Sequence, residues 1–175
     1  MKKDKENLPS EARGQVPENM TPLEILKLAI YDEQSACDFY SYLSGQIRNQ
    51  SGKEKFKFLA EDEKRHRSIL EKEYQKESKG RKFGFDPKKA KTIRVKVDGE
   101  SSASSALDLA IQAERGAYKF YTSAAEKVKS QSSKSMFLRL AEEEDRHYNL
   151  LAAERQALSS NFYWYGYDVP GVMEE

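Results

Sequence analysis

Apolar residues recur every three or four positions in four long stretches of the chain, and this period predicts four amphipathic α-helices. They are expected at about residues 21–49, 51–78, 102–128 and 132–158. Between the second and third stretches the pattern breaks down at about residues 80–103, which predicts a long connection. The periodicity therefore indicates an all-α protein.

Local signals define where the first two helices begin. Thr21 can cap the first helix, Pro22 suits its first turn, and Glu24 can complete a capping box. Ser51 and Glu54 repeat this pattern before the second stretch. Both sites are therefore predicted helix starts.

Three segments lie outside the helical pattern. Residues 1–20 are polar, with two prolines and a glycine, and are expected to form a flexible N-terminal arm. In the connection, TIRVKV (92–97) alternates like a short strand. Residues 161–175 are rich in aromatic side chains and are expected to pack on the bundle or on a second copy. The domain proper is predicted at residues 21–160.

The two halves of the chain are related by an ungapped offset of 81 positions. Residues 29–40 (AIYDEQSACDFY) align with 110–121 (AIQAERGAYKFY), and residues 56–66 (FKFLAEDEKRH) align with 137–147 (FLRLAEEEDRH). A duplicated helix pair joined by a long crossover predicts an antiparallel four-helix bundle.

Four glutamates occupy positions on the apolar stripes: Glu33, Glu63, Glu114 and Glu144. Burying one ionised carboxylate costs several kcal/mol even after relaxation, on the order of 20 kcal/mol in the idealised limit. No lysine or arginine lies on these stripes to neutralise them. Two divalent cations would cancel the four negative charges, so the pattern favours a two-metal site.

Each half also contributes one histidine, three residues after a stripe glutamate. Glu63 and His66 lie one helical turn apart on nearly the same face, as do Glu144 and His147, so each pair can reach one ion. The glutamates of the first and third helices complete each site and can bridge the two ions. The predicted ligands are Glu33, Glu63, His66, Glu114, Glu144 and His147.

Neighbouring residues have plainer interpretations. The acidic residues beside the motifs are interpreted as surface charge; they are Glu61, Asp62, Glu142, Glu143 and Asp145. Tyr40 and Tyr121, seven residues after the stripe glutamates, should line the same core, either as packing residues or beside the metals. Cys37 and Tyr118 follow those glutamates by four positions and are candidates for contact with the site, although Cys37 is favoured as a small apolar residue.

These motifs, AIYDE and AIQAE with EDEKRH and EEEDRH, resemble the rubrerythrin branch of the ferritin-like superfamily over about residues 21–160. The resemblance implies a ferritin-like fold, a di-iron centre held by the six residues above, and reaction with peroxide or ferrous iron. Typical members carry a further glutamate where this chain has Ala117, and a rubredoxin domain that needs more than the single cysteine present. Electrons would therefore come from a separate donor such as rubredoxin, or from ferrous iron itself.

Composition narrows the function classes. The formal net charge is +1 with 34% charged residues, and no basic block is strong enough to indicate nucleic-acid binding. One cysteine excludes an internal disulfide and fits a reducing compartment. No apolar run approaches the roughly 20 residues of a membrane helix, and the N-terminus lacks an apolar signal core. A soluble, cytoplasmic protein with no membrane partner is expected.

The favoured interpretation is a di-iron oxidoreductase, of peroxidase or ferroxidase type, that reacts with hydrogen peroxide or dioxygen in oxidative-stress defence or iron handling. Mixed oxygen and nitrogen ligation suits iron or manganese, whereas affinity alone would favour metals such as zinc. The alternative is a non-catalytic protein that binds, stores or senses iron. A homodimer is expected in which the aromatic tail contributes to the interface.

Overall fold

The computed structural model describes residues 14–47, 50–90, 94, 96 and 100–159. Within these residues it contains no strand, and its helices are α1 (Pro22–Gln46), α2 (Gln50–Glu77), the short 3₁₀ helix η1 (Pro87–Lys89), α3 (Glu100–Lys127) and α4 (Gln131–Ser159). The predicted all-α class and the four long helices are confirmed. The expected short strand and the aromatic tail fall largely or wholly outside the described residues.

The helix ends follow local hydrogen bonding. Thr21 and Glu24 form the predicted capping box at the start of α1. The corresponding prediction for Ser51 is wrong, because α2 begins at Gln50, whose side-chain amide donates to Glu54 instead. After α2, Lys79 and Gly80 both have positive φ, and the Gly80 N–H donates to the Gln75 carbonyl, which satisfies the last turn and stops the helix.

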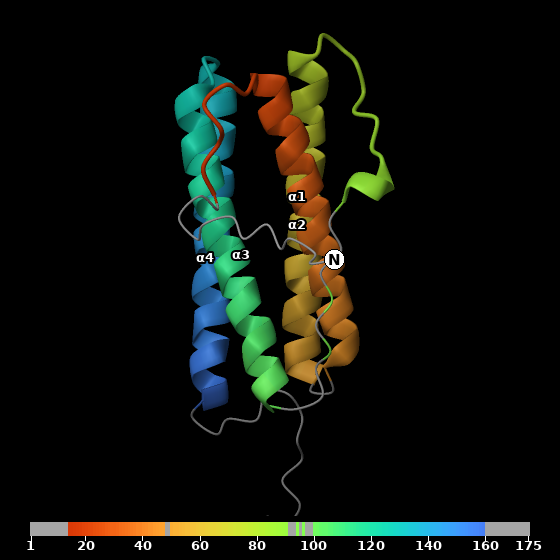
Figure 1. Cartoon of the computed structure of the whole chain (residues 1–175), viewed down its shortest axis with the longest axis vertical. Helices are drawn as coiled ribbons and strands as arrows, with labels where there is room; N and C mark the ends of the chain where they lie inside the picture. The colour runs from red at the N-terminus through yellow and green to blue at the C-terminus, as the bar shows by residue number, and fades with distance from the viewer. Residues whose placement is uncertain (1–13, 48–49, 91–93, 95, 97–99, 160–175) are drawn as a thin grey trace, which may run out of the picture.

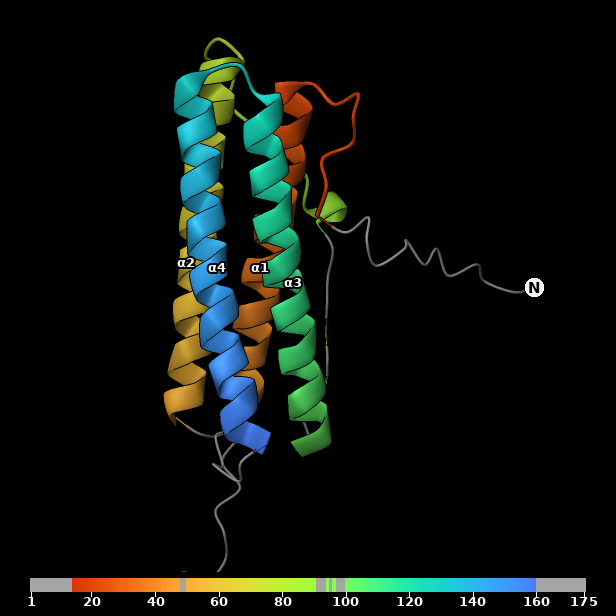
Figure 2. The same ribbon diagram turned by 90° about the vertical axis from the view of Figure 1, so that its left-hand side faces the viewer.

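The four long helices form two antiparallel pairs, α1 with α2 and α3 with α4 (Figure 1). Helix α2 ends at the top of the view and α3 begins at the bottom, so the connection between them spans the length of the bundle. This is the predicted crossover, and it makes α2 and α4 neighbours that run in opposite directions (Figure 2). The ferritin-like four-helix arrangement is confirmed.

The core consists of two apolar clusters at opposite ends of the bundle. One cluster contains Phe39, Leu43, Phe56 and Leu151, and the other contains Ile30, Phe120, Phe137 and Leu140, each with further apolar neighbours. The stripe glutamates and both histidines lie in neither cluster and are buried nonetheless. The bundle therefore encloses a polar layer between two apolar ones.

Two segments outside the long helices lie on the α1 and α3 side of the bundle (Figure 2). In the N-terminal segment, Val16 is buried and its N–H donates to the Ser123 hydroxyl, while Lys127 donates to the Pro17 carbonyl. The expectation of a flexible arm over residues 1–20 is therefore wrong for residues 14–20, which pack on the bundle, and residues 1–13 lie outside the described residues. The crossover is held by Phe83 and Phe85 against Tyr31.

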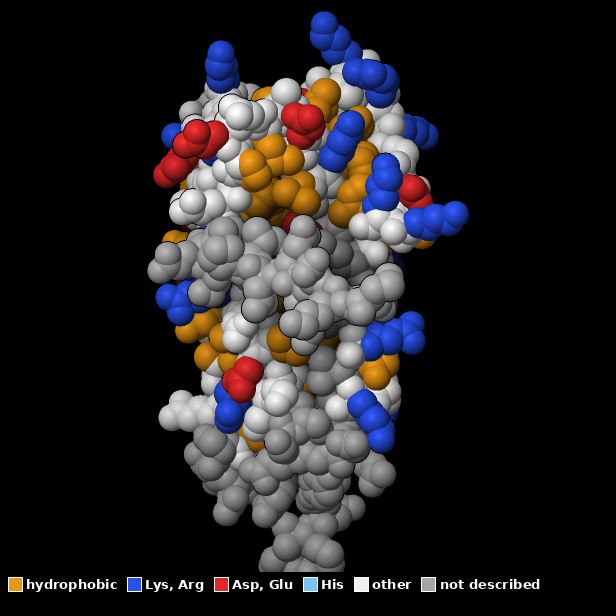
Figure 3. Space-filling view, viewed as in Figure 1, with side chains coloured by type: hydrophobic (Ala, Val, Ile, Leu, Met, Phe, Trp, Pro, Cys, Tyr) orange, Lys and Arg blue, Asp and Glu red, His pale blue; other side chains and the backbone are white. Residues whose placement is uncertain are grey.

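On the face shown in Figure 3, lysine and arginine side chains project among apolar and fewer acidic ones. Within the described ranges, none of the helices combines the length and the apolar character that crossing a bilayer requires.

Candidate metal centre

All six predicted ligands meet in the polar layer at the middle of the bundle. Each long helix contributes one buried glutamate, and α2 and α4 add the two histidines one turn further on. Their donor atoms fall into two groups, each with all its atoms within 4.8 Å of one another. The first group is Glu33, Glu63, His66 and Glu144, and the second is Glu63, Glu114, Glu144 and His147.

Glu63 and Glu144 belong to both groups, and each offers one oxygen to either side. His66 Nδ1 lies 3.2 Å from Glu63 Oε2 and 3.0 Å from Glu144 Oε1. His147 Nδ1 lies 3.3 Å from Glu63 Oε1 and 3.5 Å from Glu144 Oε2. The carboxylates placed to bridge two ions are therefore those of α2 and α4.

The glutamates of α1 and α3, which the sequence left able to bridge the ions, each face one donor group. Glu33 Oε2 lies 3.8 Å from His66 Nδ1, and Glu114 Oε2 lies 3.8 Å from His147 Nδ1. Each belongs to one group only. The helical period places a glutamate on the inward face but does not say how far the helices of opposite pairs are apart, and that distance decides which carboxylates are shared.

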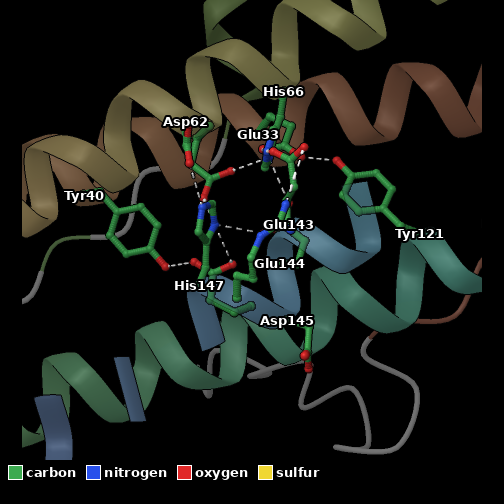
Figure 4. A network of polar contacts seen from close by, with 12 residues as sticks. Glu33, Tyr40, Asp62, His66, Tyr121, Glu143, Glu144, Asp145 and His147 are labelled. Atoms are coloured by element: carbon green, nitrogen blue, oxygen red, sulfur yellow. Dashed lines mark hydrogen bonds and ion pairs between the residues drawn. The ribbon is translucent and has the colours of Figure 1, made fainter. Parts of the chain in front are cut away.

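The second nitrogen of each histidine faces a carboxylate on the opposing helix (Figure 4). His66 Nε2 lies 2.8 Å from Glu143 Oε2, and His147 Nε2 lies 3.1 Å from Asp62 Oδ2. These contacts turn both Nδ1 atoms toward the glutamates and fix the orientation of the rings. The interpretation of Asp62 and Glu143 as surface charge is therefore wrong, since both are partly buried and serve the site.

Two tyrosine hydroxyls also contact the glutamates of the centre, each from the opposite helix pair. The Tyr40 hydroxyl donates to Glu114 Oε1, and the Tyr121 hydroxyl donates to Glu33 Oε1. Burial and the nearby carboxylates raise the pKa of both tyrosines, so both hydroxyls keep their protons and act as donors. In Figure 4 the two tyrosines flank the network from opposite ends. Both contact the centre, beyond their role in packing.

Four buried polar atoms in this part of the structure have no hydrogen-bond partner: Glu63 Oε1, His66 Nδ1, Glu144 Oε1 and His147 Nδ1. A buried polar atom without a partner costs about 1–3 kcal/mol, more when charged. Ligands about 2.0–2.2 Å from one ion lie about 3 Å or more apart, as these donors do. The donor set therefore fits two cations with mixed carboxylate and imidazole ligation.

The pKa shifts of the buried glutamates and histidines are consistent with cation binding. Burial and the carboxylates around it, Glu144 foremost, raise the pKa of Glu114 to about 8. Burial likewise raises the pKa of Glu63 well above its usual range, with repulsion from the other three glutamates adding to it. For His66, burial alone would lower the pKa, but Glu144, Glu33 and Glu63 outweigh it and raise the pKa. Protons and metal ions therefore compete for the same atoms.

Tyr118 and Cys37 belong to neither donor group. Tyr118 is 41% exposed and points to solvent, so its expected contact is wrong. Cys37 is half-buried, and burial raises the pKa of its thiol. The expectation that no arginine lies on the glutamate stripes is wrong for Arg67, which follows Glu63 by four residues; its guanidinium contacts Gln34 and Glu71 and lies over the Phe85 ring.

Two comparisons with known proteins found similarity over most of the chain. A family model described as Rubrerythrin matches residues 24–155. Among solved structures, the chain is similar to a hypothetical protein from Pyrococcus furiosus, with 29% sequence identity and a TM-score of 0.76; the match covers 91% of this chain and 99% of the other. No curated protein matches the sequence.

Proposed function

The chain belongs to the rubrerythrin family, and from this premise we propose that it is a di-iron oxidoreductase that reacts with hydrogen peroxide or dioxygen. The observation that carries the proposal is the pair of donor groups sharing Glu63 and Glu144, in which one oxygen of each of these glutamates and both histidine Nδ1 atoms have no hydrogen-bond partner. The proposed ligands are the six residues predicted from the sequence: Glu33, Glu63, His66, Glu114, Glu144 and His147.

When bound, two ferrous ions would supply the two electrons that reduction of hydrogen peroxide to water consumes. The chain's own residues prepare the centre for this. Glu63 and Glu144 would each offer an oxygen to both ions, while Asp62 and Glu143 keep the imidazole Nε2 protons in place. The apolar clusters on either side exclude bulk water, which strengthens the interaction of the carboxylates with cations.

One observation favours a second candidate, a protein that binds, stores or senses iron without turnover. Ala117 stands where typical family members have a further glutamate, and it packs against the apolar cluster that contains Phe120. Without that carboxylate the centre has one ligand fewer with which to accommodate a change in oxidation state.

Stopped-flow oxidation of the ferrous-loaded protein separates the two candidates. An oxidoreductase should oxidise its iron rapidly on mixing with peroxide or dioxygen, and a Glu63→Ala variant should not. Ferrous iron that stays reduced for minutes in the presence of both oxidants would exclude the proposed activity and leave the binding function.

The source of electrons and the oligomeric state of the protein are also proposed. We propose a separate electron donor such as rubredoxin, because one cysteine cannot form a second iron site of four thiolates within these residues.

We propose a cytoplasmic homodimer. Its interface is assigned to residues 161–175 because they are rich in aromatic side chains. Light scattering on the full chain and on a chain ending at residue 160 tests this, and a monomeric full chain at micromolar concentration would exclude it.

A further inference from the structure

Arg65 makes contacts that its counterpart in the repeat does not. Arg65 Nη2 donates to Asp62 Oδ1 at 2.9 Å, its Nε lies 3.2 Å from the same oxygen, and Nη2 also donates to Glu143 Oε2. Arg146, 81 positions later, has its Nη2 3.9 Å from Glu143 Oε1, beyond hydrogen-bond distance, and its side chain is 68% exposed. One cation therefore serves both outer carboxylates.

These two carboxylates are the partners of the two histidines. Glu143 Oε2 receives Arg65 and lies 2.8 Å from His66 Nε2. Asp62 receives Arg65 on Oδ1 and faces His147 Nε2 with Oδ2, at 3.1 Å. Arg65 is thus one contact away from a ligand of each donor group.

Arg65 also joins elements that no turn connects. It lies on α2, as does Asp62, whereas Glu143 lies on α4 of the other helix pair. Glu63 and Glu144, which belong to both donor groups, are the sequence neighbours of Asp62 and Glu143. A guanidinium that holds Asp62 and Glu143 together therefore holds the two shared glutamates in register as well.

We propose that Arg65 is the positioning residue of both metal sites, holding Asp62 and Glu143 so that the two imidazole rings present Nδ1 to the ions. The inference rests on the proposed metal centre, though not on its redox activity. Loss of a histidine's outer carboxylate contact typically weakens metal binding about 10- to 100-fold. Arg65 acts on both contacts, so both sites should weaken.

The direction in which metal affinity changes when Arg65 is removed distinguishes a positioning role from a simple effect of charge. Arg65 is a cation near a site for cations, so by Coulomb's law alone its removal should tighten metal binding. As a half-exposed ion pair with no role in positioning, it should contribute little to stability and leave metal affinity unreduced. Weaker metal binding in a stably folded variant is therefore specific to positioning.

The test compares Arg65→Met with Arg146→Met in the full chain, since the two changes remove the same charge from repeat-related positions. Zinc and cobalt affinities are measured by competition with a chelator, together with unfolding of the metal-free proteins and ¹⁵N NMR of the histidines in the zinc-loaded state. In Arg65→Met we expect both ions to bind about 10- to 100-fold more weakly. The Nε2–H signals of His66 and His147 should also shift, while Arg146→Met behaves as wild type and Arg65→Lys recovers part of the affinity.

Three results would count against the inference. Wild-type affinity and unshifted histidine signals in Arg65→Met would overturn it while leaving the metal centre intact. Equal losses in both arginine variants would also overturn it, because they would indicate a general effect of surface charge. Failure of the wild-type protein to bind any zinc, cobalt or iron would refute the metal centre itself, and the inference with it.

Discussion

At the scale of single residues, the centre is assembled from contacts that cross the bundle. Tyr40 of α1 donates to Glu114 of α3, and its repeat mate Tyr121 donates to Glu33. Each tyrosine ring also stacks on a phenylalanine, with centroids 6.0 Å apart for Tyr40 and 5.9 Å for Tyr121. The duplicated sequence thus produces duplicated contacts, and the two sites are near equivalents.

Shared and unshared glutamates should differ in what their removal costs. Glu63→Ala or Glu144→Ala takes an oxygen from both donor groups, so we expect metal content to fall from two ions to one or fewer per chain. Glu33→Ala or Glu114→Ala affects one group and should leave one ion. The measurement is iron per chain after anaerobic loading and desalting, with exposed Glu61→Ala as the control. Two retained ions in both Glu63 and Glu144 variants would contradict the ligand assignment.

Removing a tyrosine hydroxyl should weaken one site selectively. Tyr40→Phe frees Glu114 to rotate, so the second donor group should lose about 10- to 100-fold in affinity while the first stays nearly unchanged. Tyr121→Phe should do the reverse. A two-site calorimetric titration with zinc measures both, and exposed Tyr118→Phe serves as the control. Equal weakening of both sites by either variant would argue against separate roles.

At the scale of elements, the α1 and α3 side of the bundle is covered by further segments, and the α2 and α4 side differs from it. The N-terminal segment and the crossover pack on the side of α1 and α3, where Val16 enters the apolar cluster of Phe120 and Phe137. Along the side of α2 and α4 the described residues include no such covering segment (Figure 2). There the outer carboxylates and the 54% exposed Phe58, whose ring centroid is 6.5 Å from that of His147, separate the centre from solvent.

The packing of the N-terminal segment can be tested at Val16. Fully burying a valine contributes about 1.5–3 kcal/mol, and a charge placed there should detach the segment rather than enter the core. Val16→Asp should therefore lower the free energy of unfolding of the metal-free protein by about 1–3 kcal/mol, as measured by urea denaturation. Gln15→Asp adds the same charge at the exposed neighbouring position and should change stability by less than about 0.5 kcal/mol. Equal effects of the two variants would show that the segment contributes little to stability.

At the scale of the whole molecule, folding and metal binding are linked through the buried carboxylates. The pKa of Glu114 is raised to about 8, so its protonated form stabilises the metal-free fold. That contribution is complete below the unfolded value near 4.5 and is lost as the pH rises toward 8. The raised pKa of Glu63 acts in the same direction. Bound cations replace these protons and remove the repulsion.

The melting temperatures of loaded and metal-free protein should therefore diverge with pH. We expect the metal-free protein to lose stability between pH 5 and 8, and the loaded protein to exceed it most near pH 8. With free metal at about 100 times the dissociation constant, each site should contribute about 2.7 kcal/mol. Calorimetry at several pH values measures the gap. Identical melting of the two forms at neutral pH would contradict the coupling.

The sequence by itself determined the four helices, the repeat, the crossover and the identity of the six inward-facing residues. These depend on the helical period and on the cost of burying charge, both of which are local properties of the chain. The tertiary structure alone decided that Glu63 and Glu144 are shared, that Glu143 and Asp62 orient the histidines, and that each tyrosine serves the opposite helix pair. Such choices depend on the distance and stagger between helices of different pairs. Spacings of three and four residues describe only one helix at a time, so they cannot specify a contact between two.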